Sequence, residues 1–100
     1  MKYNQSIPPI HPGEILLEDY LRPLNISQNE LSLKMRIPPQ RISDIVNGKR
    51  SISPDTAIRL AKVIGTTAKF WLSLQMDYDL RVECMNNETK INREVEAMVV

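Results

Sequence analysis

The sequence predicts an all-α fold with one domain, and three observations support this. Apolar residues recur at intervals of three and four over most of the chain, which is the spacing of one buried helix face. Residues that cap helix starts, such as Ser27 and Ser53, precede these segments, and Gly48 and Gly65 follow two of them. No convincing strand alternation appears before the last ten residues. A chain of 100 residues with 42% hydrophobic content can bury one core without disulfides or metal.

The first expected elements are an extended arm and a helix. Residues 1–10 are predicted to be extended, because Pro8 and Pro9 resist helix formation. A helix is predicted over residues 12–24, with Glu14 favourably placed in its first turn. Its inward side chains, at helical spacing, are Leu17, Tyr20, Leu21 and Leu24. Pro23 predicts a tightened or kinked last turn.

Residues 27–50 have the pattern of a helix-turn-helix. Ser27 can cap the first of its two helices, and Glu30 completes a capping box three residues later. Leu31 and Met35 then lie on the inward face. The short segment that follows leaves room for a tight turn alone, so two helices are expected at a fixed angle.

The second helix of this motif is expected over residues 38–47. A proline suits a first helical turn, where backbone N–H groups have no partner, and Asn47-Gly48 suits a helix end. Its buried stripe is Ile42, Ile45 and Val46. Its outer face keeps polar side chains, namely Gln40, Arg41, Ser43, Asp44 and Asn47. Such a face is expected to enter a DNA major groove, where Arg pairs with guanine and Gln with adenine.

Two further helices are expected. Ser53, Pro54 and Asp55 provide a cap, a first-turn proline and a first-turn acid for a helix over residues 54–64 that Gly65 ends. Its inward stripe is Ala57, Leu60, Ala61 and Ile64.

The last helix is expected over residues 67–85, with Asn86-Asn87 as its end. One side carries Trp71, Leu74, Tyr78 and Val82, and another carries Leu72, Met76 and Leu80. A helix that is apolar on two sides usually packs against two surfaces, so a second copy of the chain is expected beside the core. Phe70, Trp71, Leu74 and Tyr78 are expected to be core or dimer anchors. Residues 86–100 form a tail that either joins the dimer contact or is disordered.

Charge is concentrated around the helix-turn-helix. The chain has a net charge of +1, but residues 31–69 carry eight Lys or Arg against Asp44 and Asp55. The segments on either side are net acidic. The basic third can therefore supply phosphate contacts, which dominate affinity for DNA. The acidic ends suit another partner or simply solubility.

Composition excludes several other classes. Cys84 and His11 are the only cysteine and histidine, so neither a disulfide framework nor a usual zinc cluster can form. No long apolar run or leader is present, which predicts a cytoplasmic protein without a membrane segment. Without paired carboxylates or a phosphate-binding glycine loop, we expect no enzyme, cofactor or small-molecule substrate.

From residue 11 to about residue 80 the chain resembles the HigA (VapI-like) antitoxin family of Cro/C1-type helix-turn-helix proteins. The resemblance is carried by HPGEILLEDYLRPLNISQNELS, by IPPQRISDIVNGKRSISPDTAIRLAK and by GTTAKFWLSLQMDYDL. It implies a five-helix lambda-repressor-like domain over residues 11–85, with the arm and tail outside it. It also implies a homodimer on palindromic operator DNA, with half-sites roughly 10 base pairs apart or a multiple. The family's partner is typically a small RelE-like RNA endonuclease toxin, encoded in the operon that the antitoxin represses.

The resemblance also assigns site residues. Gln40, Arg41 and Ser43 would face bases, and Asp44 and Asn47 share their helix. Residues near phosphates would be Ser27, Gln28, Pro39, Lys49, Arg50 and Ser51. Two positions depart from the motif, because Arg36 replaces the usual turn glycine and Ser32 replaces a small alanine. Arg36 must adopt a turn with negative φ or carry the cost of a left-handed residue.

Three alternatives remain open at this point. A Cro/C1-type repressor without a toxin partner would share the same DNA-binding residues. A protein-interaction module that has lost DNA binding is disfavoured by the retained Arg41, Lys49 and Arg50. A plain helical hairpin with a solvated surface is disfavoured by the short turn and the local charge.

Overall fold

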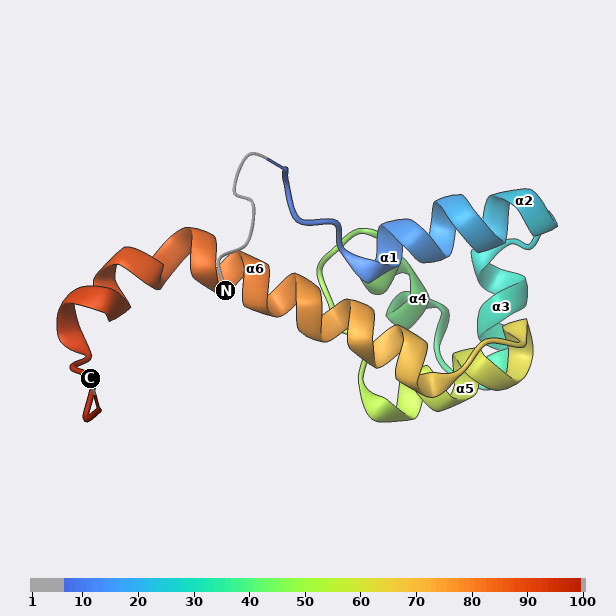
Figure 1. The fold of residues 1–100 in the computed structure, drawn as a ribbon. Coiled ribbons are helices and arrows are strands. Elements are labelled where there is room, and N and C mark those ends of the chain that lie inside the picture. The colour runs from blue at the N-terminus through green and yellow to red at the C-terminus, as the bar shows by residue number, and fades with distance from the viewer. Residues whose placement is uncertain (1–6, 100) are drawn as a thin grey trace.

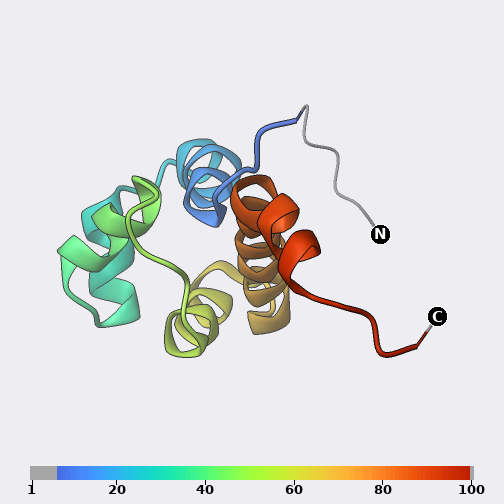
Figure 2. The same cartoon turned by 90° about the vertical axis from the view of Figure 1, so that its left-hand side faces the viewer.

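The computed structural model describes residues 7–99, which form five helices and no strand, so the predicted fold class is confirmed (Figure 1). The first helix consists of three consecutive segments, α1 (Pro12–Ile15), η1 (Leu16–Leu21) and α2 (Arg22–Leu24). The others are α3 (Gln28–Met35), α4 (Pro39–Val46), α5 (Pro54–Ile64) and α6 (Ala68–Glu94). The shorter helices surround the core, and α6 closes one side and projects beyond them (Figure 2).

The middle of the first helix is a π-helix, for which Pro23 provides a physical reason. A helical proline has no N–H, and its ring clashes with the carbonyl four residues earlier. Here the Arg22 N–H bonds to the carbonyl of Leu17, five residues earlier, so the helix is widened before Pro23. The last turn itself is tightened, one of the two expected outcomes, because the Asn25 N–H bonds to the Arg22 carbonyl three residues earlier at 3.1 Å. The two fully buried leucines, Leu16 and Leu21, are consequently five residues apart. The predicted stripe was wrong at Leu24, which is 55% exposed.

The predicted helix starts are confirmed by side-chain caps. Ser27 Oγ accepts a hydrogen bond from the Glu30 N–H at 3.0 Å. Ser53 and Thr67 cap α5 and α6 in the same way. Each bond satisfies one of the N–H groups that a first helical turn leaves without a partner. Gly65 ends α5 with φ of +88°, as the sequence predicts.

The turn between α3 and α4 has a left-handed residue. Arg36 has φ of 58°, so it takes the costlier of the two expected conformations. The N–H groups of Arg36 and Ile37 bond to the carbonyls of Leu33 and Ser32 at 3.3 and 3.1 Å. Ser32 is fully buried and donates to the Asn29 carbonyl, so it still allows close helix packing.

The core is built around Trp71, which is fully buried. Its Nε1–H donates to Thr66 Oγ1 at 2.7 Å, and its ring lies 5.4 Å from that of Tyr20. The other buried apolar side chains are Leu16, Leu21, Leu31, Met35, Ile37, Ile42, Ile45, Ile52, Ala57 and Leu60. The neighbouring Phe70 is 37% exposed, so of this adjacent aromatic pair Trp71 alone is buried in the core.

The predicted end of the last helix at Asn86-Asn87 was wrong. Helix α6 continues to Glu94, and Asn87 Nδ2 donates to Glu83 Oε2 at 2.7 Å, one helical turn earlier. Asparagine lowers helix propensity only modestly, so two of them do not end a long helix. Residues 95–99 lie outside the helix and are exposed. Of the expected arm, residues 7–10 are non-helical, and residues 1–6 lie outside the described part. No helix within residues 7–99 is both long and apolar enough to cross a bilayer.

Candidate nucleic-acid interface

Helix α4 presents a polar face to solvent. Pro39 is its first residue, and Asn47 and Gly48 end it, the latter with φ of +74°. Ile42 and Ile45 are fully buried and fix which side of the helix points outward. The expected buried stripe is therefore confirmed, except that Val46 is half-buried, and the helix is one residue shorter at each end than the predicted range 38–47.

The polar side chains on the outer face pair along the helix. Gln40 Nε2 donates to Asp44 Oδ1 at 2.8 Å, and Asn47 Nδ2 donates to Ser43 Oγ at 3.4 Å. Both pairs join residues one helical turn apart, which lie on the same side of a helix. The structure thus brings four of the five predicted base-reading residues together on one accessible surface. Amide and carboxylate groups are among those that read base edges in a major groove.

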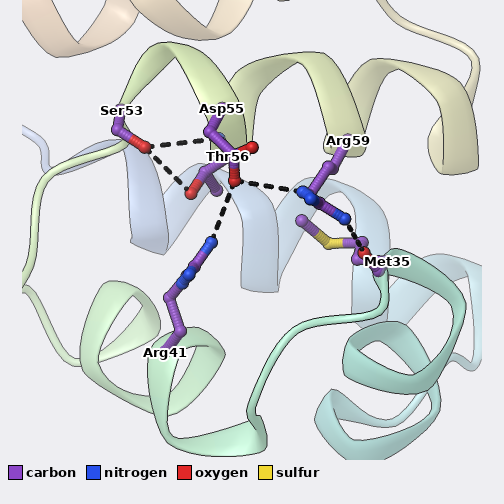
Figure 3. Close-up of polar contacts among 6 residues, drawn as sticks. All are labelled: Met35, Arg41, Ser53, Asp55, Thr56 and Arg59. Carbon is purple, nitrogen blue, oxygen red and sulfur yellow. Dashed lines mark hydrogen bonds and ion pairs between the residues drawn. The ribbon is translucent and has the colours of Figure 1, made fainter.

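Arg41, the fifth predicted base-reading residue, contacts a different helix. Its Nη1 lies 3.1 Å from Oδ2 of Asp55, in the first turn of α5 (Figure 3). The same carboxylate oxygen lies 3.0 Å from Nε of Arg59, and Arg59 Nη1 donates to the Met35 carbonyl at 2.9 Å. The hydrogen bond from Arg59, with that from Arg41, holds the pKa of Asp55 below its usual value. These contacts link α3, α4 and α5.

The loop after α4 carries the predicted phosphate-binding residues Lys49, Arg50 and Ser51, which are all exposed. Gln75 of α6 holds this loop, because its buried Oε1 accepts a hydrogen bond from the Ile52 N–H at 2.8 Å. The sequence reasoning missed Gln75. Its signal was a polar residue one helical turn after Trp71, on the face that packs against the core.

The remaining predicted phosphate-binding residues come from the starts of α3 and α4. Ser27 is exposed and uses its hydroxyl oxygen to cap α3, whereas Gln28 is half-buried. Pro39 is exposed at the first turn of α4 and offers DNA no side-chain donor. The phosphate candidates therefore lie in three segments, and their contacts with DNA stay predictions.

A second missed residue, Gly13, sets how closely α1 approaches α4. A Cβ built on Gly13 would lie 1.8 Å from the backbone oxygen of Ile45 and 2.6 Å from its carbonyl carbon. A contact this short with backbone requires the helices to move apart. Gly13 therefore allows the first helix to brace the end of the predicted recognition helix.

His11 braces the same junction. Its Nδ1 accepts a hydrogen bond from the Gly13 N–H at 2.9 Å, and its ring meets Tyr78 of α6 edge-on at 4.9 Å. Burial lowers the pKa of His11, although nearby Asp79 and a hydrogen bond with the Arg50 backbone oppose that shift. The neutral imidazole is therefore the form that the folded protein favours.

This lowered pKa predicts acid sensitivity. A histidine with a folded pKa below its unfolded value of about 6.5 stabilises the fold fully above that pH. The stability is lost as pH falls through the folded pKa, because the unfolded chain then binds the extra proton. We expect the melting temperature to fall between pH 7 and pH 5. His11→Asn, which keeps a capping side chain but does not titrate, should flatten this dependence. If the melting temperatures of the wild type and of His11→Asn fall equally with pH, the role of His11 is contradicted.

The helix-turn-helix family model matches residues 17–71, which include α3 and α4. The chain belongs to this helix-turn-helix family. Members of the helix-turn-helix family bind DNA through the second helix of the motif and are not enzymes.

Individual relatives narrow the placement. Virulence-associated protein I of Dichelobacter nodosus is 45% identical over 77 residues, which are 77% of this chain and 71% of that protein. A HigA-family addiction module antidote protein from Coxiella burnetii is 46% identical, with a TM-score of 0.86 over 91% of this chain and 99% of that one. Pseudomonas aeruginosa antitoxin HigA, solved with the higBA promoter, is 38% identical, with a TM-score of 0.88 over the same shares. Within the helix-turn-helix family, the chain belongs with the HigA- and VapI-like proteins.

Proposed function

We propose that this protein is a DNA-binding antitoxin that represses transcription of its own operon. The observation that carries the proposal is the exposed polar face of α4, with the basic loop after it, on a fold similar to that of a HigA solved with promoter DNA. Operator DNA lies in the bacterial cytoplasm, so that is the proposed compartment.

In this proposal, the four paired side chains of α4 enter the major groove. These base-reading residues are Gln40, Ser43, Asp44 and Asn47. Arg41 reads a base from its place beside Asp55, and Lys49 and Arg50 bind phosphates on the flank. Asp44 accepts from a cytosine amino group, or repels phosphate where contact is unwanted.

The proposed assembly is a homodimer formed through α6. Met76 and Leu80 are 68% and 47% exposed, and with Leu72 they line a shallow apolar groove on that helix. The C-terminal part of α6 projects from the bundle, so it is free to pack along a second copy (Figure 1). Two copies related by a two-fold axis would place two α4 helices on a palindrome with half-sites about 10 base pairs apart, or a multiple.

The second proposed partner is a small toxin, specifically a RelE-like RNA endonuclease that the antitoxin neutralises by direct binding. The support is the description of the Coxiella burnetii relative as an addiction module antidote. An RNA-cleaving enzyme needs basic surface, and residues 1–30 and 70–100 of this chain are net acidic. The alternative function is a Cro/C1-type repressor without a toxin, which the same DNA-binding surface would serve.

A reporter strain can test the repressor and antitoxin roles separately. The chain should lower expression from the promoter of its own gene. The triple variant Gln40→Ala, Ser43→Ala, Asn47→Ala should restore expression while keeping the helical circular-dichroism spectrum. A control double on exposed positions outside α4 and α6, Asp19→Ala with Lys62→Ala, should still repress. If the triple and the control double behave alike, α4 does not read the operator.

The toxin role has its own readout in the same strain. The neighbouring reading frame should arrest growth when it is expressed alone, and co-expression of this chain should restore growth. Repression without any effect on growth would favour the alternative repressor.

A further inference from the structure

One carboxylate of α5 contacts the only arginine of the predicted recognition helix. Oδ2 of Asp55 lies 3.1 Å from Arg41 Nη1 and 3.0 Å from Arg59 Nε. Arg59 is itself tied to the Met35 carbonyl at the end of α3. Figure 3 shows Arg41 reaching from α4 toward Asp55, with Arg59 on the far side of that carboxylate.

This arrangement does more for orientation than for stability. Asp55 is exposed, and ion pairs at exposed positions contribute little to folding. The Arg41 side chain keeps 25% of its surface exposed and uses Nη1 for the carboxylate. A guanidinium carries five N–H donors in a rigid planar fork, so a contact at one nitrogen restricts the directions of the others. Arg41 therefore stays partly accessible with a defined orientation.

We propose that Asp55 is a positioning residue that makes Arg41 discriminate between DNA sequences. This inference rests on the proposed function. While Asp55 holds the Arg41 guanidinium, its remaining N–H groups can donate to a base edge at one position in the operator. To reach a phosphate instead, Arg41 must leave Asp55, whose negative charge also repels phosphate. Without the carboxylate, Arg41 is free to bind phosphates on DNA of any sequence, whereas Arg59 keeps its hydrogen bond to the Met35 carbonyl.

The test is Asp55→Asn, titrated against operator DNA and scrambled DNA of equal length. Affinity for scrambled DNA should rise more than affinity for the operator, so that the ratio of operator affinity to scrambled-DNA affinity falls about tenfold. The salt slope on scrambled DNA should also steepen by about one unit for each arginine that gains a phosphate. If Asp55 is only structural, Asp55→Asn should lower the melting temperature but should not steepen the salt slope on scrambled DNA. An unchanged ratio overturns the proposal.

Glu30→Gln on α3 is the control for charge, because it removes one negative charge as Asp55→Asn does. Among the described residues no ion pair joins Glu30 to Arg41 or Arg59. An equal fall in the ratio for Glu30→Gln would overturn the proposal. In an Arg41→Ala background, Asp55→Asn should change the ratio no more than Glu30→Gln does. If Asp55→Asn is unfolded, Asp55→Ser replaces it, since serine removes the same charge with a smaller polar side chain.

The two levels of the proposal fail differently. Wild-type protein that does not prefer its operator overturns the proposed function and this inference together. Wild-type protein that prefers its operator, with a ratio unaffected by Asp55→Asn, overturns this inference alone.

Discussion

Trp71→Ala is expected to reduce the free energy of unfolding by about 3 to 5 kcal/mol, the usual cost of truncating a buried tryptophan. The side chain is fully buried and packs against Tyr20 from the first helix. Its removal also leaves Thr66 Oγ1 without the N–H that it accepts. For a domain of this size the melting temperature should fall by more than about 12 °C.

Phe70→Ala is the matched control for this loss. Phe70 lies next to Trp71 on α6 but is 37% exposed, so its truncation leaves a smaller cavity. Circular dichroism at one protein concentration should rank the stabilities as wild type, then Phe70→Ala, then Trp71→Ala. Trp71 is the only tryptophan, so fluorescence cannot follow the variant that lacks it. Equal losses for both variants would place Trp71 outside the core.

Gly13→Ala is expected to cost about 3 kcal/mol, the upper end of the usual cost of overpacking. The added methyl group would lie 1.8 Å from the Ile45 backbone oxygen, and no side-chain rotation can relieve a contact between backbone and Cβ. Because α1 must then move away from α4, operator affinity should fall as well, even at temperatures where the variant is folded.

Gly65→Ala provides the comparison, because it adds the same atoms where nothing lies within 4 Å. Its cost arises only from φ of +88°, which disfavours an L-residue by about 1 to 2 kcal/mol. Chemical denaturation should therefore show the larger loss for Gly13→Ala, and operator affinity should change only for that variant. A Gly13→Ala protein as stable as wild type would show that α1 is free to shift.

Local signals explain what the sequence predicts correctly. The caps at Ser27, Ser53 and Thr67 each bond to an N–H three residues later, so a short window contains the whole interaction. The ends of α4 and α5 are also local signals, because a glycine with positive φ, Gly48 or Gly65, follows each helix. Fold class and helix starts follow from such signals.

Features that depend on distant partners were not predictable in this way. The Ile45 carbonyl that requires Gly13, and the loop N–H that Gln75 accepts, belong to other segments. Periodicity placed Arg41 on the polar face of α4, but its partner Asp55 lies fourteen residues later on α5. The π-helix was not predicted either, because a 3.6-residue period cannot represent the wider turn before Pro23.

The most direct test of the central claim is a titration of the purified protein against its own promoter at two salt concentrations. Scrambled DNA of equal length serves as the control. We expect nanomolar binding to the promoter, at least about a thousandfold tighter than to scrambled DNA and weakened by salt. Equal binding to both DNAs, or none to either, would contradict the assignment of α4 as a recognition helix.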